Sequence, residues 1–400
     1  MRIAEGRTAD LLVDAAARWG TPLYLTDLDR AAANLRAYQD AFPGALIAYA
    51  VKANPDPQLL RRLVAGGAGC EVVTAVELAL ARRAGCPAER IVMNGVGKRD
   101  EELHLALGAG ILINAESLEE LVALLTLARD HPDARIGLRM NPALDAATHP
   151  HLATGAASSK FGIPLKDLPQ ALAAVNTAGR TIESLGAHIG SAVESLDSFA
   201  DLASRLADAA SSLPEVRIDI GGGLDGPDAS ALGDAVRPHL PDATRLILEP
   251  GRSLVADAGW LVTRIVRVQP RPDQGMTYLV ADAGMTELIR PMLYGAVHPV
   301  TLVSPGEPLP ADAGRVDLAG PVCEAGDVLA HDLAQWLSAE ELATTGTGAL
   351  LAIGQAGAYG AAMASVYNGR LRPAEAVLEA GELRLSRRRE TLDDLTARDV

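Results

Sequence analysis

The sequence predicts an α/β protein with an added β domain, in which a (β/α)8 TIM-like barrel is followed by a C-terminal β-barrel-like domain. Two features carry this prediction. Up to about Gly251, short apolar runs alternate with amphipathic helical patterns, and there are eight such units, the number that closes a barrel. Beyond Gly251, strand-like runs joined by Gly/Pro turns replace this alternation, which is typical of a separate and mostly β domain.

The eight predicted barrel strands are short runs rich in apolar and β-branched residues. Stretches between them, such as "DPQLLRRLVAGG" and "SLEELVALLTLARD", repeat apolar residues every three or four positions, as amphipathic helices do. The fifth unit carries an insertion at 141–162 that is rich in His, Ser, Thr and Gly, and both an ordered flap and a mobile loop fit it. The strands are expected at 46–52, 70–74, 91–94, 111–114, 135–140, 182–188, 216–222 and 245–251.

The second predicted domain covers 256–400 and is joined by an N-terminal segment, 1–27, while the barrel covers 28–255. Its strand-like runs include "WLVTRIVRV", "MTYLVADAG", "HPVTLVS", "RVDLAG", "ALLAIGQAG" and "EAVLEAGELRLSRR", with little helical pattern between them. The N-terminal stretch "TPLYLTD" is expected to add a strand to this domain.

Composition and charge exclude several functional classes. The 36 basic and 51 acidic residues give a net charge of −15, which disfavours binding to nucleic acid or to an anionic membrane. No apolar run is long enough to span a bilayer, and the N-terminus lacks the apolar region of a signal peptide, so we expect a cytoplasmic protein. Three widely spaced cysteines predict neither a disulfide framework nor a zinc site, and no metal is expected.

Polar residues or glycines stand at the end of every predicted barrel strand. The carboxyl ends of barrel strands line the active-site face of such folds, so these positions are candidates for a catalytic site. They are Lys52, Thr74, Asn94, Asn114, Arg139, His188, Gly221 to Gly223 and Glu249 to Arg252.

The glycine motifs "GGGLDG" and "EPGR" follow the seventh and eighth predicted strands. These two loops often form the phosphate site of barrel enzymes, because glycine lets backbone N–H groups approach phosphate oxygens closely. Three consecutive glycines are by themselves more typical of a tight turn. Their place after a seventh strand favours a phosphate site.

Lys52 ends the buried run "LIAYAVK" on a cation, which raises the question of its role. A lysine at the mouth of a barrel, beside a phosphate site, can form a Schiff base with pyridoxal phosphate. Glu249 could then pair with the pyridine nitrogen, and His188 could lie against the ring. Each residue also has a purely structural alternative. Lys52 could extend its amine to solvent, Glu249 could be a structural carboxylate, and His188 could be a core histidine with its hydrogen bonds satisfied.

The β domain adds further candidates. Arg290 and Tyr294 lie four residues apart and share a face if that segment is helical. Two arginines, Arg252 and Arg290, suit recognition of a carboxylate, although surface ion pairs are an alternative. Two turn-rich stretches carry one reactive side chain each, Cys323 and Tyr359; a lone cysteine beside acidic residues is more often inert.

Taken together, these motifs resemble the fold-type III pyridoxal phosphate-dependent decarboxylases, which share an alanine racemase-like fold, and within them the diaminopimelate decarboxylase family. The resemblance covers nearly the whole chain. It rests on "TPLYLTD", "YAVKAN", "VVTAVEL", "GVGK", "LRMNP", "THPHLATGAASSKFGI", "HIGS", "GGGL", "EPGR", "ADAGMTELIRPMLYGA", "GPVCEAGDVLA", "GAYG" and "RRRETLDDL".

The resemblance implies decarboxylation of meso-diaminopimelate to L-lysine and CO2, and a role for each matching residue. Lys52 would form the Schiff base with pyridoxal 5′-phosphate, His188 would stack on its ring, and Cys323 would protonate Cα after CO2 leaves. The cofactor would be bound by Lys52, His188, Ser191, Gly221, Gly222, Gly223, Glu249, Gly251, Arg252 and Tyr359. The amino-acid substrate would be bound by Arg252, Arg290, Tyr294, Glu324 and Tyr359. Cys323 and Glu324 reach the site from the other subunit in this family, which implies a homodimer with shared active sites.

One departure from the family pattern affects the substrate. The family usually has serine after the Cys-Glu pair, in contact with the distal end of diaminopimelate, whereas this chain has Ala325. A pyridoxal phosphate-dependent decarboxylase of another amino acid or conjugate in a secondary pathway is therefore the alternative. Three other functions are disfavoured. The Cys-Glu pair disfavours an amino-acid racemase, and the retained Lys52 disfavours a pseudoenzyme that only binds a partner. The β domain disfavours a small single-barrel protein.

Overall fold

The computed structural model describes most of the chain: residues 7–144, 154–193, 195–213, 215–224, 226, 228–242 and 244–400. Within the insertion predicted at 141–162, residues 145–153 lie outside the described part. The choice between an ordered flap and a loop therefore stays open.

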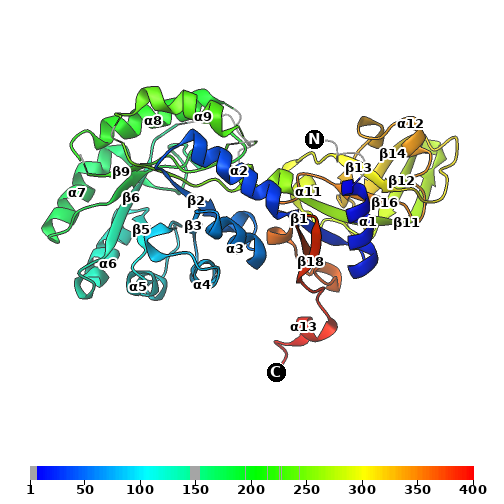
Figure 1. Ribbon diagram of the computed structural model, residues 1–400, viewed down its shortest axis with the longest axis horizontal. Helices are drawn as coiled ribbons and strands as arrows, with labels where there is room; N and C mark the ends of the chain where they lie inside the picture. The colour runs from blue at the N-terminus through cyan, green and yellow to red at the C-terminus, as the bar shows by residue number, and fades with distance from the viewer. Residues whose placement is uncertain are drawn as a thin grey trace. The chain divides into compact units, whose positions relative to one another are not determined.

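Contacts along the chain divide it into two compact units (Figure 1). One unit is Ala32–Leu254, and the other combines the residues up to Ala31 with Val255–Val400. The predicted domain bounds, 28–255 for the barrel and 256–400 with 1–27 for the β domain, stay a prediction.

The first unit contains eight parallel strands that close into a ring among its described residues. They are β2 (Leu46–Ala50), β3 (Gly69–Val72), β4 (Ile91–Met93), β5 (Leu112–Ala115), β6 (Arg135–Asn141), β8 (Ser184–Gly186), β9 (Arg217–Asp219) and β10 (Leu246–Leu248). The pairing order is β5-β4-β3-β2-β10-β9-β8-β6, and pairing of β5 with β6 completes the ring. Each strand overlaps one predicted from the sequence, so the barrel is confirmed. A short strand, β7 (Ile163–Pro164), pairs with β6 beside the ring.

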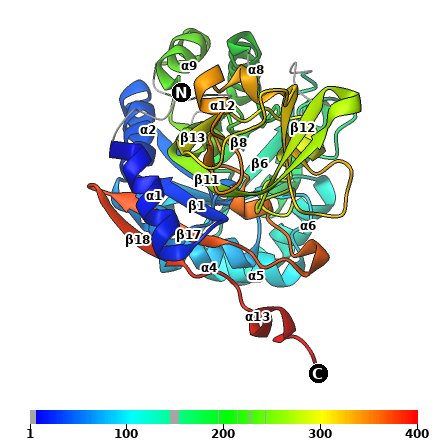
Figure 2. The ribbon, with the colours of Figure 1, turned by 90° about the vertical axis from the view of Figure 1, so that its right-hand side faces the viewer.

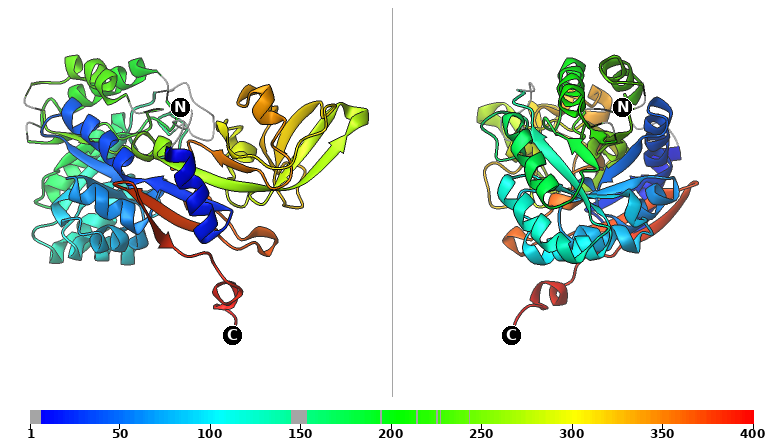
Figure 3. Two further views of the ribbon diagram at one scale, coloured as in Figure 1. Left: turned by 45° about the vertical axis from the view of Figure 1, so that its right-hand side comes forward. Right: turned by 90° about the vertical axis from the view of Figure 1, so that its left-hand side faces the viewer.

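Helices surround the ring on its outer side (Figure 3). They are α2 (Leu28–Ala41), α3 (Pro57–Ala65), α4 (Ala75–Arg83), α5 (Asp100–Gly108), α6 (Leu118–Leu127), α7 (Leu168–Thr177), α8 (Leu196–Ala210) and α9 (Ala229–Val236). In α3, the Asp56 side chain accepts hydrogen bonds from the first-turn N–H groups and Pro57 occupies the first turn, while Leu59, Leu60 and Leu63 are buried. Sequence periodicity and capping together therefore define this helix.

The barrel interior has an apolar layer near the amino ends of its strands. Ala48, Val92, Leu112 and Ile247 form one buried cluster, with Leu46 packed against it. These residues come from two strand pairs that β3 separates in the ring, so they meet across the interior. The polar residues at the carboxyl ends lie beyond this layer and are described below.

The second unit contains a nine-stranded sheet among its described residues. Its strands are β1 (Leu23–Asp27), β11 (Gly259–Arg271), β12 (Met276–Ala281), β13 (Val300–Ser304), β14 (Arg315–Ala319), β15 (Val328–Ala330), β16 (Leu350–Ile353), β17 (Ala374–Glu379) and β18 (Glu382–Arg387). The predicted N-terminal strand is confirmed as β1, which pairs antiparallel with β11 and parallel with β17. The mostly β character of this part of the chain is thus confirmed.

Helices in this unit are an addition to what the sequence predicted. The helix α1 (Arg7–Trp19) packs on β1 and β13 (Figure 2), and its residues Leu12, Ala15 and Ala16 join a buried apolar cluster with strand residues. Shorter helices are α11 (Arg290–Tyr294), α12 (Ala339–Leu342) and α13 (Leu392–Thr396). Throughout the described chain, no helix combines the length and apolar character needed to cross a membrane.

Candidate active site

Lys52 lies just beyond the carboxyl end of β2, in a single turn of 3₁₀ helix, Val51–Ala53. Its Nζ donates a hydrogen bond of 2.7 Å to Oε2 of Glu71 on β3. The side chain of Lys52 is 39% exposed, whereas that of Glu71 is 1% exposed. The amine is therefore accessible to a small molecule while a buried carboxylate holds it in place, which differs from a lysine that only extends to solvent.

Three buried carboxylates lie together at this end of the barrel: Glu71, Asp219 and Glu249. Asn94, which follows β4, donates hydrogen bonds to Glu249 Oε1 at 2.7 Å and to Glu71 Oε1 at 3.3 Å. The Asp219 and Glu249 side chains interact with each other, and the Asp219 carboxylate also accepts the N–H of Gly221 at 2.8 Å.

Burial controls the protonation of this cluster. It raises the pKa of Glu249 well above its usual range, and the charges of Asp219 and Glu71 raise it further, whereas Lys52 opposes them. Burial likewise raises the pKa of Asp219 to about 6. A cationic group placed against Glu249 would relieve this cost, so the site favours a ligand that brings its own positive charge.

His188 follows β8 and is held as a neutral ring. The backbone N–H of Gly190 donates to its Nδ1 at 3.2 Å, and Thr154 Oγ1 lies 3.0 Å from the same atom. Nδ1 therefore acts as an acceptor, which assigns the proton to Nε2. Burial lowers the pKa of His188 well below its usual value, and the nearby cations Arg139 and Lys52 lower it further. A neutral, fixed imidazole can lie flat against a ligand ring.

The glycines after β9 pack so tightly that side chains are excluded. Gly221 and Gly223 have φ angles of +67° and +105°, which L side chains rarely adopt. A Cβ on Gly222 would overlap the carbonyl oxygen of Glu249, and one on Gly223 would overlap that of Gly190. The loop therefore presents bare backbone at the carboxyl ends of β8, β9 and β10, as a phosphate site requires.

Ser191 and Arg252 meet beside this loop. Arg252 Nη2 donates to Ser191 Oγ at 3.0 Å, which joins the loop after β8 to the segment after β10. Gly251 directly precedes Arg252, which opens the short helix α10 (Arg252–Val255). A hydroxyl and a guanidinium next to bare backbone are donors suited to an anion.

Two polar residues at predicted strand ends have structural contacts instead. Thr74 is the N-cap of α4 and accepts the N–H of Glu77. Arg139 Nη1 pairs with Glu116 Oε1 at 3.0 Å, and its guanidinium lies over the Phe161 ring. A polar residue at the end of a barrel strand is therefore not always directed at a ligand.

In the second unit, Arg290 is buried and lies between two tyrosines. Its guanidinium carbon is 5.6 Å from the centre of the Tyr294 ring and 5.8 Å from that of Tyr359. Arg290 and Tyr294 are on one helix, α11, which confirms their predicted shared face and excludes a surface ion pair for Arg290. Tyr359 has a φ of +56°, a strained conformation often found at functional sites.

Cys323 and Glu324 lie in an exposed turn of the same unit. The Cys323 thiol is exposed, and its backbone N–H donates to Asn368 Oδ1 at 3.0 Å. Glu324 accepts a hydrogen bond of 2.8 Å from the Tyr367 hydroxyl. By contrast, Cys70 and Cys86 are buried.

The sequence reasoning did not assign a role to Asp219 or to the pairing of Lys52 with Glu71. Both acidic residues interrupt apolar strands, in "RIDIGGG" and "GCEVV". A charged residue inside a buried strand needs a partner, and that signal was available.

Comparison with known proteins identifies the family. A family model described as the pyridoxal binding domain of pyridoxal-dependent decarboxylases matches residues 28–256. Over 397 residues the chain is 42% identical to the diaminopimelate decarboxylase of Deinococcus radiodurans, covering 97% of this chain and 98% of that protein. The chain belongs to the diaminopimelate decarboxylase family.

Other members of the diaminopimelate decarboxylase family are similar over equally long stretches. The enzyme of Aquifex aeolicus is 38% identical, covering 96% of this chain and 92% of its own length. The crystal structure of the Helicobacter pylori enzyme complexed with L-lysine superposes with a TM-score of 0.88 at 32% identity, covering 96% of this chain and 98% of that one. The similarity to these enzymes, in sequence and in fold, therefore covers both units of the chain.

The barrel residues fit pyridoxal 5′-phosphate, the cofactor of this family. Lys52 supplies an accessible amine, and the buried Glu249 needs the positive charge that a protonated ring nitrogen provides. The bare loop Gly221–Gly223 with Ser191 suits the phosphate. Each of these chemical demands is met at the carboxyl ends of the strands.

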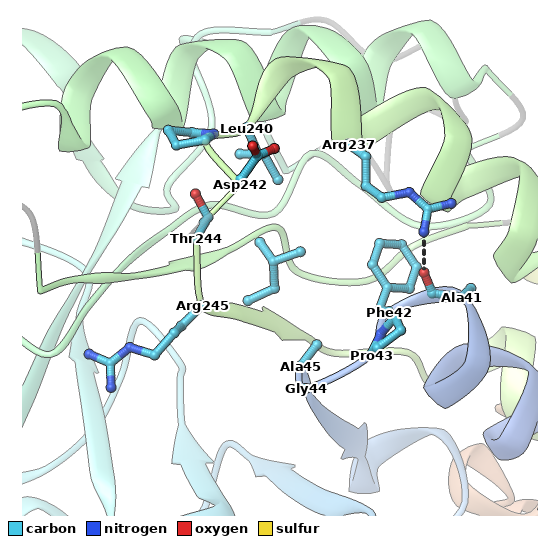
Figure 4. A pocket seen from close by; sticks show the side chains of 12 residues that line it. Ala41, Phe42, Pro43, Gly44, Ala45, Arg237, Leu240, Asp242, Thr244 and Arg245 are labelled. Carbon is cyan, nitrogen blue, oxygen red and sulfur yellow. Dashed lines mark hydrogen bonds between the residues drawn. The ribbon is translucent and has the colours of Figure 1, made fainter.

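A cavity of about 340 Å³ lies elsewhere in the barrel unit (Figure 4). It is lined by residues just before β2 and β10, including Phe42, Arg237 and Arg245, and Arg237 donates to the carbonyl of Ala41. These are the amino ends of the strands, where barrels rarely carry chemistry. We therefore assign the candidate site to the opposite, carboxyl ends.

Proposed function

We propose that this chain decarboxylates meso-diaminopimelate to L-lysine and CO2 with pyridoxal 5′-phosphate bound through Lys52. One observation carries the proposal: Lys52 is held by a buried carboxylate next to a second buried carboxylate, Glu249, that needs a cationic partner. The proposal is supported by 42% identity over nearly the full length to a diaminopimelate decarboxylase.

Pyridoxal 5′-phosphate, when bound, would supply an electron sink for the decarboxylation of an amino acid. Glu249 would stabilise a protonated ring nitrogen of the cofactor, and the neutral imidazole of His188 would contact its ring. The phosphate would be held by fixed donors from Ser191, Gly251, Arg252 and the glycine loop Gly221–Gly223.

In the second unit, Arg290 offers a buried cation for a substrate carboxylate, with Tyr294 and Tyr359 at its sides. Glu324 is an acceptor for the distal ammonium group of the substrate. The Cys323 thiol donates its proton to Cα, which completes the product amine. We further propose that Cys323 and Glu324 act in the site of the other subunit of a homodimer, and that the protein works in the cytoplasm.

A second candidate is a decarboxylase of another amino acid or conjugate. It is favoured by Ala325, which follows Cys323 and Glu324 without the hydroxyl that the family usually has there. The remaining charged groups still favour a substrate with a charge at its far end.

The test is CO2 release by the protein loaded with pyridoxal phosphate, comparing meso-diaminopimelate with the L,L isomer, lysine, ornithine and arginine. We expect turnover of the meso isomer with L-lysine as the product. Turnover of a different amino acid, with the cofactor demonstrably bound, would instead establish the second candidate.

Lys52→Ala is the matching test of the site. We expect it to abolish the visible absorbance of covalently attached pyridoxal phosphate and to remove activity, because no other amine replaces the Schiff-base nitrogen. Lys166→Ala, in the turn Leu165–Asp167, serves as the control and should retain both. Retention of the absorbance in Lys52→Ala contradicts the assignment.

A further inference from the structure

A chain of buried side-chain hydrogen bonds crosses the carboxyl end of the barrel. Ser184 Oγ on β8 donates to Asn114 Oδ1 on β5 at 2.7 Å, and Asn114 Nδ2 donates to Asn94 Oδ1 at 2.9 Å. Asn94 Nδ2 then donates to Glu249 Oε1 at 2.7 Å and to Glu71 Oε1 at 3.3 Å. All five side chains belong to buried residues, so solvent does not supply alternative partners.

The direction of this chain is fixed by its two ends. The Glu71 carboxylate already accepts a hydrogen bond from the Lys52 amine, and a carboxylate paired with a cation accepts and does not donate, so the NH2 group of Asn94 faces Glu71 and, with it, Glu249. Its carbonyl oxygen then needs a donor, which is the NH2 group of Asn114, and the Asn114 carbonyl is satisfied by Ser184. A reversed Asn94 amide would direct its carbonyl dipole at two carboxylates and lose both bonds.

The backbone leaves room for this chain at one position. A Cβ on Gly137 of β6 would overlap both Asn114 Oδ1 and Ser184 Oγ. A glycine therefore faces the point where the two side chains meet. The hydrogen-bond chain is thus accommodated by the barrel wall as well as by its own members.

Asn94 touches the two carboxylates that surround the reactive amine. Glu71 accepts from Lys52 Nζ, and Glu249 lies in the same buried cluster beside Asp219. A neutral donor between two acidic groups offsets part of their mutual repulsion without neutralising either of them. A lysine at this position would pair with one carboxylate and remove the counter-charge available to a ligand.

We propose that Asn94 is a positioning residue that holds Glu71 and Glu249 with one amide, and so links the support of Lys52 to the carboxylate that faces the cofactor ring nitrogen. Asn114 fixes the orientation of that amide by donating to its carbonyl oxygen, and Ser184 in turn fixes Asn114. This inference rests on the proposed function, since it places the cofactor against Lys52 and Glu249.

The test measures the ring nitrogen directly, by the nitrogen NMR shift of isotopically labelled pyridoxal phosphate bound to each variant. In Asn94→Leu, which is close in shape but has no donor, the Glu249 carboxylate loses a stabilising bond and competes for the ring proton. We expect the shift to move toward that of an unprotonated ring and the affinity for pyridoxal phosphate to fall roughly tenfold or more. Asn94→Ser keeps one donor and should lie between Asn94→Leu and the wild type.

A second variant and a control keep the outcome decisive if Asn94→Leu folds poorly. Asn114→Leu touches neither carboxylate, yet should move the nitrogen shift in the same direction by a smaller amount. Asn34→Leu removes another buried amide of the barrel unit, which donates to the carbonyl of Leu254, and should leave the shift unchanged.

Wild-type nitrogen shifts in both Asn94→Leu and Asn114→Leu would overturn this inference. Failure of the proposed function is distinguishable, because wild-type protein would then fail to attach pyridoxal phosphate at Lys52 at all.

Discussion

Asp219 and Glu249 interact at the carboxyl ends of the neighbouring strands β9 and β10, and burial disfavours the charge on both of them. Neither residue can ionise as readily as a carboxylate in water. At the residue scale, burying these two acidic side chains therefore carries an unfavourable electrostatic free energy, which a cationic ligand would offset. The same cost makes the stability of the cofactor-free protein depend on pH.

Asp219→Asn tests this dependence. The pKa of Asp219 rises from 3.8 to about 6 on folding, so its favourable contribution is present below about pH 3.8 and is lost as the pH rises through about 6. The cofactor-free variant should match the wild type in acid and exceed its unfolding free energy by a few kcal/mol at neutral pH. Asn can still accept the N–H of Gly221.

The measurement is urea unfolding over a series of pH values, with Asp273→Asn, in an exposed turn, as the control. A difference between Asp219→Asn and wild type that stays constant across the pH range would contradict the assignment of a raised pKa.

Cys323→Ala tests the proposed acid. Cys323 is held through its backbone N–H, which donates to Asn368 Oδ1 and which alanine retains, so the fold and the attachment of cofactor should be unchanged. Turnover at saturating substrate should fall about a hundredfold or more, because the proton must come from a less well-placed donor. Turnover within a factor of about two of wild type would show that another group protonates Cα.

At the scale of elements, the loop after β9 depends on close backbone packing against the loops after β8 and β10. The N–H of Glu249 donates to the carbonyl of Gly221 at 2.8 Å, and Val193 donates to the carbonyl of Gly223 at 2.9 Å. These bonds hold the peptide groups of the glycine loop in fixed positions. A phosphate site built on backbone is therefore as rigid as the strands that carry it.

Gly223→Ala should disturb this element. The added methyl group overlaps the carbonyl of Gly190 and the residue has a positive φ, so we expect the affinity for pyridoxal phosphate to fall at least about tenfold, with a loss of stability of about 1–3 kcal/mol. Gly108→Ala, in α5, meets nothing within 4 Å and should stabilise slightly. Equal cofactor affinities for the two variants would rule out the proposed phosphate loop.

At the scale of the whole molecule, the proposal requires two copies of the chain for each complete site. Lys52 and Glu249 belong to the barrel unit, and Cys323 and Glu324 belong to the β unit. If the two sets come from different subunits, each subunit alone is incomplete. Association then becomes a condition for activity and not only for stability.

Complementation between two inactive variants tests this arrangement. A mixed dimer of Lys52→Ala and Cys323→Ala carries one site with both residues intact, so random exchange of subunits should restore about a quarter of the wild-type activity. Each variant by itself serves as the baseline. No recovery after verified subunit exchange would place both residues in one subunit's site.

Much of the barrel could be predicted because its signals are local. Runs such as "LIAYA" and "RIGLRM" are apolar and short, and helical periodicity separates them, so strand count and order follow from the chain itself. The helix α1 was not predicted, although Leu12, Ala15 and Ala16 have helical spacing and are buried together. The N-cap of α3 is local as well, because Asp56 directly precedes Pro57 at the start of the helix.

By itself, the sequence determined the (β/α)8 barrel, the β domain, the strand-end position of Lys52 and the glycine loop, since each depends on the order of neighbouring residues. Only the tertiary structure decided which carboxylate holds Lys52 and which amide joins Glu71 to Glu249. Asn94 and Glu249 are 155 residues apart and meet only because the closed ring brings the ends of β4 and β10 to the same interior. Ring closure sets that proximity, and no local pattern encodes it.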